Sequence, residues 1–226
     1  MKYPISECFY AFQGEGIHSG SAAYFIRVYG CPLQCKWCDS AGTWHKSWAP
    51  DHIDRLEPLE IVELVKQHNK KGFIVLTGGE PSIFDLNPLI TCIKAEVDTK
   101  VHIETSGAFT IRGDVDWITV SPKWNRLPLP ENIKKAHEIK IIVENKDSIE
   151  AWVEVIGNAL TVPIWLHPEW SQRHNPEVLD SISSYVKNHG GVFRAGWQLH
   201  KLYGVDLLDV NSKPPVPLGG DETYGY

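Results

Sequence analysis

Three cysteines within eight residues are the part of this sequence best suited to chemistry. Cys31, Cys35 and Cys38 have the spacing C-x3-C-x2-C, whereas Cys8 and Cys92 stand alone. Thiolates are soft ligands that select zinc, copper(I) or iron–sulfur clusters. Five cysteines, an odd number, do not make a closed disulfide framework, so clustered thiols indicate metal or redox chemistry.

Three alternatives remain open for these thiols. A structural zinc needs four ligands, so His45 or one of the isolated cysteines would have to supply the fourth. A redox dithiol formed by Cys35 and Cys38 would leave Cys31 unused. A four-iron cluster uses all three thiolates and keeps one iron open for chemistry, as a catalytic zinc keeps an open position.

The elements that must position this loop alternate between strands and helices. Apolar runs predict strands at 22–29, 73–76, 101–103, 117–120, 138–143 and 163–166, and helices are predicted at 57–71, 85–96, 147–158 and 176–189. Residues 50–56 are interpreted as a polar linker. This alternation predicts an α/β fold with a mostly parallel sheet and crossover connections.

Polar residues or glycines follow four of the predicted strands. They occupy 77–80, 104–107, 121–123 and 167–169. Ligands bind at the carboxyl ends of strands in parallel sheets and barrels. We therefore expect these segments to meet at one rim, together with the cysteine loop that leaves the first predicted strand.

Length and composition narrow the function classes. The 226 residues make one domain with an appendage, predicted as a core over 1–210 and a Pro/Gly-rich arm over 211–226. Twenty-two Lys and Arg against 28 Asp and Glu give a net charge of −6, which lacks a broad basic surface for nucleic acid. No apolar run approaches the about 20 residues that cross a membrane, and the start has no signal-peptide core, so we expect a cytoplasmic protein.

The loop CPLQCKWCDSAGTW, with TGGEP after the next strand, resembles the radical S-adenosylmethionine (SAM) superfamily. FYAFQGEG at 9–16, Arg27, CDS at 38–40, ETSG, SPK and QLHK narrow the resemblance to the 7-carboxy-7-deazaguanine synthase family, over residues 5–205. The resemblance implies an incomplete TIM-like barrel with about six mostly parallel strands and few helices.

The resemblance also implies an activity and its requirements. Members are lyases that convert 6-carboxy-5,6,7,8-tetrahydropterin to 7-carboxy-7-deazaguanine, with release of ammonia, in queuosine biosynthesis. The implied cofactors are a 4Fe-4S cluster, SAM and magnesium. The implied partners are the small pterin substrate, a second copy of the chain in a homodimer, and a reductase or flavodoxin-type electron donor. Nucleic acid and membrane are not expected to bind directly.

Site residues follow from the resemblance, position by position. The three clustered cysteines would bind the 4Fe-4S cluster and Ser40 the magnesium ion, and no catalytic residue beyond the cofactor ligands is expected. The residues expected to bind SAM are Trp37, Cys38, Asp39, Gly78, Gly79, Glu80, Glu104, Ser106, Ser121, Pro122, Lys123, His167, Pro168, Glu169 and Trp170. The residues expected to bind the substrate are Phe12, Gln13, Gly14, Glu15, Arg27, Thr77 and His200.

Physical reasons accompany several of these roles. Arg27 is the one charge inside its apolar strand, and a buried guanidinium needs an anion, either the substrate carboxylate or an internal ion pair. Gly78 and Gly79 would let the backbone approach the methionine part of SAM, whose ammonium group Glu80 would bind. In some relatives the chain stops soon after the motif that ends in HK and its terminal carboxylate reaches the substrate. Here the chain continues, and Asp206 is a candidate replacement.

Two rival functions stay open at this point. A radical SAM activase that abstracts hydrogen from a protein glycine also carries C-x3-C-x2-C, but it has no use for an arginine facing a small carboxylate. A non-enzymatic iron–sulfur or zinc module needs few residues beyond the cysteine loop. The long remainder of this chain disfavours such a module.

Overall fold

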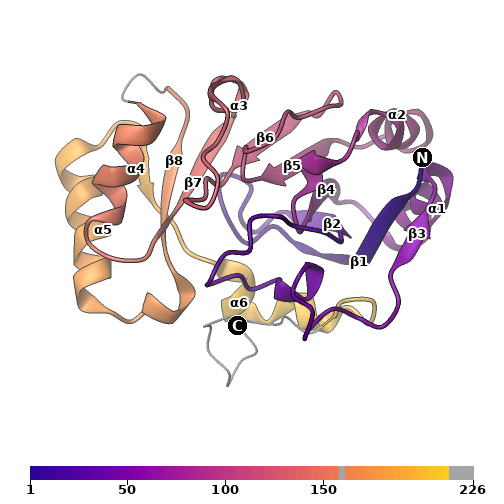
Figure 1. The fold of residues 1–226 in the computed structure, drawn as a ribbon, viewed down its shortest axis with the longest axis horizontal. Coiled ribbons are helices and arrows are strands. Elements are labelled where there is room, and N and C mark those ends of the chain that lie inside the picture. The colour runs from indigo at the N-terminus through magenta and orange to yellow at the C-terminus, as the bar shows by residue number, and fades with distance from the viewer. Residues whose placement is uncertain (158–160, 214–226) are drawn as a thin grey trace.

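The computed structural model describes residues 1–157 and 161–213. Its strands are β1 (Tyr3–Phe12), β2 (Ala22–Val28), β3 (Asp54–Leu56), β4 (Phe73–Gly78), β5 (Val101–Thr105), β6 (Trp117–Val120), β7 (Glu138–Val143), β8 (Ile164–Pro168) and β9 (Phe193–Ala195). They form one open, curved sheet in the order β3-β1-β2-β4-β5-β6-β7-β8-β9 (Figure 1). Pairing is parallel from β2 to β9, and β1 pairs antiparallel with β2 and β3. The predicted α/β class and incomplete parallel barrel are confirmed.

Most of the helices pack on the outer side of the sheet, whereas the last of them, at 199–203, lies beside the central cavity. They are α1 (Pro58–His68), α2 (Asn87–Glu96), α3 (Pro130–Lys135), α4 (Ser148–Ile156), α5 (Pro176–His189) and α6 (Leu199–Tyr203), with short 3-10 turns η1 (Ala41–Thr43), η2 (Pro81–Ile83), η3 (Trp170–Gln172) and η4 (Val205–Leu208). Four of the six helices carry proline in the first turn, where its missing N–H costs nothing. In the described part of the chain, no helix has the length and apolar character needed to cross a membrane.

The six predicted strands and four predicted helices all occur, with bounds that shift by a few residues. Sequence analysis does not predict β1, β3 and β9, and the predicted linker at 50–56 contains β3. The sequence of β1, YPISECFYAF, mixes polar with apolar residues because one of its faces lines the barrel interior. Residue 158, the expected end of one helix, and residues 214–226 of the predicted arm lie outside the described residues.

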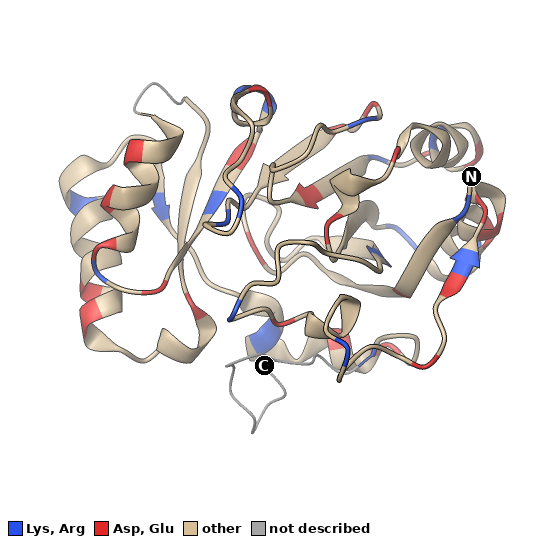
Figure 2. Ribbon diagram, in the orientation of Figure 1, with Lys and Arg blue, Asp and Glu red and all other residues tan. Residues whose placement is uncertain are grey.

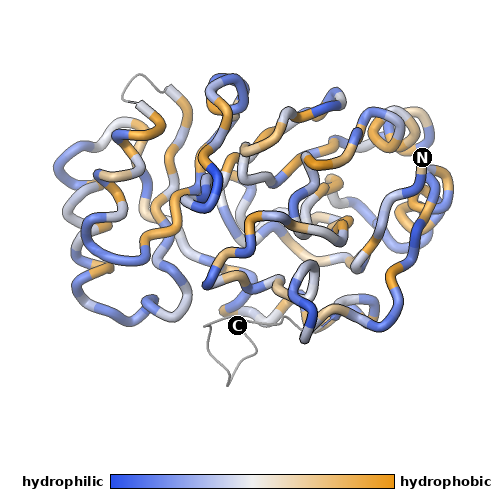
Figure 3. The backbone as a smooth tube through the Cα atoms, in the orientation of Figure 1, coloured by the Kyte–Doolittle hydropathy of each residue, from blue (hydrophilic) through white to orange (hydrophobic). Residues whose placement is uncertain are grey.

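Alternate side chains of each strand face opposite sides of the sheet. In β7, Ile139, Ile141 and Val143 join the core beneath the helices, whereas Lys140 and Ile142 line a central cavity. Figure 3 shows hydrophobic residues concentrated along the strands and the inner sides of the helices. Figure 2 shows charges on the central strands β5 and β7 as well as on the outer helices, so the interior of the barrel is not a purely apolar core.

Two segments fill the side of the barrel that the sheet leaves open. The loop after β1 enters the barrel, and the Leu199 N–H at the start of α6 donates to the Gly14 carbonyl at 2.9 Å. The segment after α6 runs beside β1, where the Tyr10 N–H donates to Asp209 at 2.8 Å. The C-terminal part of the described chain therefore completes the wall of the cavity.

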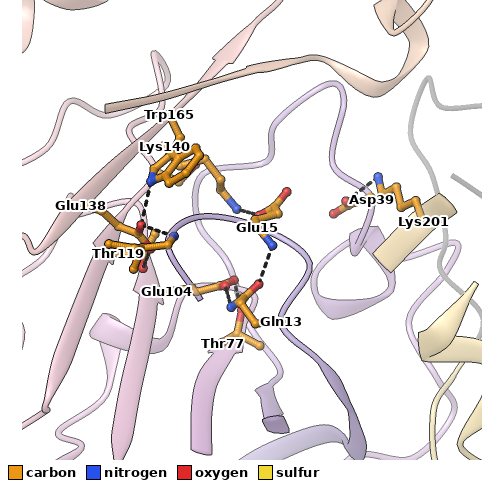
Figure 4. Close-up of polar contacts among 12 residues, drawn as sticks. Gln13, Glu15, Asp39, Thr77, Glu104, Thr119, Glu138, Lys140, Trp165 and Lys201 are labelled. Carbon is orange, nitrogen blue, oxygen red and sulfur yellow. Dashed lines mark hydrogen bonds and ion pairs between the residues drawn. The ribbon is translucent and has the colours of Figure 1, made fainter. Parts of the chain in front are cut away.

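Glu138, at the start of β7, joins its own strand to three other parts of the barrel. Its side chain is 3% exposed and accepts hydrogen bonds from Thr119 at 2.8 Å, from the indole N–H of Trp165 at 2.8 Å and from the Ile17 N–H at 2.9 Å. The indole N–H of Trp117 donates to it at 3.3 Å. One carboxyl group thus ties β6, β7, β8 and the loop after β1 together, and it forms no ion pair with a described residue (Figure 4).

Removing this carboxyl group will destabilise the fold. We expect Glu138→Ala to lower the free energy of unfolding by about 3 kcal/mol, because buried donors lose their acceptor and a cavity remains. Equilibrium urea unfolding measures the change. Glu154→Ala on the exposed face of α4 is the matched control and should change stability by less than about 0.5 kcal/mol. Equal stability of the two variants would contradict the role given to Glu138.

Candidate active site

One cavity lies at the carboxyl ends of the parallel strands and encloses about 1100 Å³ of empty space, part of it open to solvent. It gathers the cysteine loop, three of the four predicted strand ends (77–80, 104–107 and 121–123), the loop after β1 and the C-terminal elements, whereas the predicted strand end at 167–169 does not line it. The predicted site residues that line it are Phe12, Gln13, Gly14, Glu15, Arg27, Cys31, Cys35, Trp37, Cys38, Asp39, Ser40, Thr77, Gly78, Gly79, Glu80, Glu104, Ser106, Ser121, Lys123 and His200.

The three clustered cysteines are free thiols on one wall of this cavity. Burial raises the pKa of Cys31 to about 11 and also raises the pKa values of Cys35 and Cys38, so a bound metal would have to displace their protons. Within the described ranges, no three His, Cys, Asp or Glu side chains are placed to hold a single metal ion. Three soft donors on one short loop, facing a cavity large enough for a cofactor, fit an iron–sulfur cluster.

The end of β4 packs directly on the start of the cysteine loop. The Gly79 N–H donates to the Val28 carbonyl and the Glu80 N–H donates to the Gly30 carbonyl, both at 2.9 Å. A Cβ atom on Gly79 would lie 2.2 Å from the Gly30 oxygen, and one on Gly78 would lie 2.3 Å from the Val28 oxygen. Glycine is therefore required here by contact between two backbone segments, a reason that the sequence analysis did not give.

Glu80 has a set of internal partners that its expected role did not include. The carboxyl group is 1% exposed and accepts hydrogen bonds from the N–H and hydroxyl groups of Ser82 and Ser106 and from the Thr105 hydroxyl, at 2.5 to 3.0 Å. These five donors occupy the usual acceptor capacity of a carboxyl group. Glu80 and Ser106 therefore join the ends of β4 and β5 within the cavity wall.

Arg27 points into the cavity from β2 and is paired internally. Its Nε donates to the Glu7 carboxylate at 2.5 Å, and the Arg27 side chain is 19% exposed. Burial would lower the pKa of Arg27, but Glu7, with smaller contributions from Asp39 and Asp206, raises it. The ion pair engages Nε, and no hydrogen bond joins the two terminal nitrogens to another described residue. These terminal nitrogens remain available to a second anion.

The C-terminal elements bring Asp206 and His200 to the cavity and place Lys201 against Asp39 of the cysteine loop. Asp206 lines the cavity, and burial raises its pKa. Lys201, in α6, pairs with Asp39 at 2.8 Å and holds the pKa of that carboxyl well below its usual range against the opposing effect of burial. His200 packs on Gly14, where a Cβ atom would lie 2.0 Å from the imidazole Nδ1. α6 thus connects the cysteine loop to the loop after β1.

Lys123 and Trp37 line the cavity together with the thiols. The Lys123 ammonium lies 5.3 Å from the centre of the Trp37 ring and donates to the Ser121 hydroxyl at 2.7 Å. The indole N–H of Trp44 donates to the Cys38 sulfur at 3.4 Å, and the Ser40 hydroxyl lies 3.8 Å from the same sulfur. The predicted magnesium residue therefore lies beside one of the three clustered thiols.

A polar network spans the floor of the cavity (Figure 4). The amide nitrogen of Gln13 donates to Glu104 at 2.7 Å, the Thr77 hydroxyl donates to Glu104 at 3.4 Å, and the Gln13 oxygen accepts from the Glu15 N–H at 3.1 Å. Lys140 donates to the Glu15 carboxylate. Glu104, expected near SAM, is therefore hydrogen-bonded to two residues expected to bind substrate.

Five residues expected to bind SAM do not line the cavity. They are Pro122, His167, Pro168, Glu169 and Trp170. His167 is completely buried, and neither ring nitrogen has a hydrogen-bond partner among the described residues. Glu169 accepts hydrogen bonds from Ser171, as the cap of η3. These side chains lie behind the wall, so any contact with a cofactor remains a prediction.

Several cavity residues are absent from the sequence-based set. Lys140 and Ile142 line it from β7, and Trp44, Phe9 and Phe25 line it from the cysteine loop and the first two strands. Lys140 was recognisable, because it is a lone cation inside an apolar strand, the same signal that singles out Arg27. The aromatic residues carry no comparable signal, since their spacing equally fits an apolar core.

The same cavity can hold a soft metal cluster at the three thiols and a carboxylate at Arg27, and hydrogen-bonding groups also line it. Such a cavity suits a small acidic molecule that reacts close to a metal-bound cofactor.

Comparisons with known proteins agree with this geometry. The Radical SAM superfamily model matches residues 25–160. The 7-carboxy-7-deazaguanine synthase of Flavobacterium psychrophilum is 40% identical over 206 residues, which cover 89% of this chain and 92% of that protein. The enzyme of the same name from Synechocystis is 36% identical over 209 residues, covering 91% of this chain and 94% of that protein.

A solved structure shares the fold over nearly the whole chain. The crystal structure of QueE from Escherichia coli superposes with a TM-score of 0.75 at 30% identity, and the match covers 88% of this chain and 95% of that one. The superfamily implies a 4Fe-4S cluster and SAM as cofactors, and three thiols on one wall of the cavity fit that requirement. With this cavity, this fold and these relatives, the chain belongs to the 7-carboxy-7-deazaguanine synthase family of radical SAM enzymes.

Proposed function

We propose that this protein converts 6-carboxy-5,6,7,8-tetrahydropterin to 7-carboxy-7-deazaguanine with release of ammonia, for queuosine biosynthesis. The observation that carries the proposal is the placement of Arg27 in the same cavity as the three thiols. A substrate carboxylate on the terminal nitrogens of Arg27 would hold the ring system between that arginine and the cofactor wall.

Bound SAM and the 4Fe-4S cluster would supply the carbon radical that starts the reaction. The residues of this chain would bind and orient the cofactors and the substrate, and they would keep water out of the cavity. Cys31, Cys35 and Cys38 would hold three irons, and Glu80 keeps the ends of β4 and β5 together next to them. Glu104, Gln13 and the floor network would then face the substrate ring rather than SAM.

The remaining proposed contacts rest on position in the cavity. Trp37, Asp39, Ser121 and Lys123 line it beside the thiols, which supports a role in binding SAM. Ser40 is proposed as the magnesium ligand. A hydroxyl is a weak ligand for a hard cation, so substrate oxygens and water would complete the shell.

Partners are also part of the proposal. The exposed residues Pro32, Gln34 and Lys36 lie between the thiols on the same loop, which supports access for a reductase or flavodoxin-type electron donor. Exposed apolar side chains on α6 and η4, among them Tyr203 and Leu208, support a homodimer. Free thiols in the cavity support action in the cytoplasm, where thiols stay reduced.

Anaerobic reconstitution tests the function directly. The protein would be loaded with iron and sulfide and incubated with the carboxylated pterin, SAM, magnesium and a reductant. The proposal predicts a deazapurine product, detected by mass, together with released ammonia. Cleavage of SAM without any deazapurine would show a radical enzyme with another substrate.

Cys35→Ala should remove one cluster ligand and leave the fold intact. We expect the variant to lose most of its bound iron and its SAM cleavage, because a cluster held by two thiolates is poorly retained. Iron analysis after anaerobic reconstitution and circular dichroism measure the two effects. Cys92→Ala is the matched control, since Cys92 lies on α2 away from the cavity. Normal iron content in Cys35→Ala would refute the ligand assignment.

Arg27→Gln should weaken substrate binding. Loss of a charge-assisted contact is expected to raise the KM for the pterin about 10- to 100-fold. Steady-state kinetics with varied pterin measure this change. Arg55→Gln, on the exposed face of β3, is the control and should keep the wild-type KM. An unchanged pterin KM in Arg27→Gln would remove the carboxylate site from the proposal.

A further inference from the structure

Lys140 is a buried cation that the proposed chemistry has not yet used. It lies in β7, points into the barrel and lines the cavity floor, with a side chain 12% exposed. Its ammonium group donates to one carboxylate oxygen of Glu15, which comes from the loop after β1 (Figure 4). A lysine held in a cavity wall in this way connects the sheet to the loop expected to bind substrate.

Glu15 is held in place, but only one of its two carboxylate oxygens has a hydrogen-bond partner among the described residues. Its backbone N–H donates to the Gln13 oxygen at 3.1 Å, and the amide nitrogen of Gln13 is fixed by Glu104 at 2.7 Å. The second carboxylate oxygen, Oε1, is buried and has no hydrogen-bond partner among the described residues. Buried carboxylate oxygens are rarely left without a partner, so an unpaired oxygen on a residue that lines a cavity indicates a missing donor.

The charges around the pair keep Glu15 ionised. Burial alone would raise the pKa of Glu15, but Lys140, with His167 and His200 nearby, holds it well below its usual range. Burial alone would lower the pKa of Lys140, but Glu15, Glu104 and Asp39 raise it above its usual range. Each partner therefore depends on the other for its charge.

We propose that Lys140 is a positioning residue for substrate selection, which holds Glu15 as a carboxylate with one oxygen free to accept an N–H hydrogen bond from the edge of the substrate ring. The ligand class is a planar heterocycle with an amino or ring N–H donor at one edge and a carboxylate for Arg27. This inference rests on the proposed function, because the pterin is the ring in question. Lys140 acts through Glu15, and the only contact required of Lys140 is with that residue.

The alternative is that the pair only closes the barrel floor. Glu138 already ties β7 to the same loop through the Ile17 N–H, so the floor has a second attachment that does not face the cavity. A role confined to stability predicts that loss of Lys140 lowers stability without any pH-dependent change in pterin binding. Substrate positioning predicts such a change.

The test compares Lys140→Met and Lys140→Arg with wild type. Pterin binding to the reconstituted, SAM-loaded enzyme would be measured by anaerobic calorimetry between pH 6 and pH 8.5. At pH 7.5 we expect Lys140→Met to weaken binding about 10- to 100-fold and Lys140→Arg to recover most of the affinity. Lys134→Met, exposed on α3, is the charge-matched control and should bind like wild type.

The pH dependence has a defined sign. Without the lysine, burial raises the pKa of Glu15, so the carboxylate is lost as the pH falls and the ratio of variant to wild-type Kd should increase from pH 8.5 to pH 6. A ratio that stays constant, or equal affinities for Lys140→Met and wild type, would overturn the inference. Titration of the pterin itself changes the Kd of every variant by the same factor. The ratio of variant to wild-type Kd therefore reports only on titration of groups in the protein.

Two further outcomes distinguish failure of this inference from misfolding of the variant and from failure of the proposed function. If Lys140→Met does not fold, the double variant Glu15→Gln/Lys140→Met removes both charges and should bind weakly with no pH-dependent ratio. Wild-type affinity in that double variant would contradict the inference. Failure of the wild-type enzyme itself to bind the pterin would instead refute the proposed function.

Discussion

The structure depends on how each charged side chain buried inside the open barrel is paired with an opposite charge or with hydrogen-bond donors. A buried charge without a partner costs several kcal/mol, so each one in the cavity wall needs an opposite charge or several N–H and O–H donors. Arg27 has Glu7, Lys201 has Asp39 and Lys140 has Glu15. Among the described residues, Glu80 and Glu138 form no ion pair and are instead held by hydrogen-bond donors from neighbouring strands and loops.

These interactions also explain why a sheet that does not close still forms a defined cavity. The ion pairs connect strands to segments far away in the sequence. Glu15 and Lys140 are 125 positions apart, and the Lys213 N–H donates to Glu7, 206 positions away, at 2.5 Å. The loop after β1 and the C-terminal elements are thereby fixed against the open side of the barrel. Arg27 and Glu15, which belong to these ion pairs, are also the groups proposed to bind the carboxylate and the ring edge of the substrate.

The sequence predicts the elements that pack beneath the outer helices better than the strands and side-chain pairs that line the interior of the barrel. Apolar runs such as FIVL and EIKIIV identify β4 and β7, because their outward residues pack beneath helices. β1 is missed because its inward face carries Glu7, which breaks the apolar run. The cysteine spacing predicts the thiol wall, since three ligands on one short loop are local. Partners such as Glu7 for Arg27 and Lys140 for Glu15 depend on strand order, and strand order is not a local property.

The same distinction applies to individual site residues. Glu80 and Ser106 are predicted as cofactor contacts from position in a motif, and the structure shows that they bind each other across two strand ends. His167 is predicted to contact the cofactor; the structure shows that it is buried and does not line the cavity, and its contact with a cofactor stays a prediction. Residue type and spacing identify which segments meet at the rim, whereas side-chain partners are decided by packing between distant strands.

An anaerobic crystal structure with the cluster, SAM and the carboxylated pterin tests the central claim most directly. We expect the pterin carboxylate on the terminal nitrogens of Arg27 while Glu7 stays on Nε, and SAM beside the one iron that no cysteine holds. A fourth protein ligand on the cluster, or a pterin carboxylate bound away from Arg27, would contradict it.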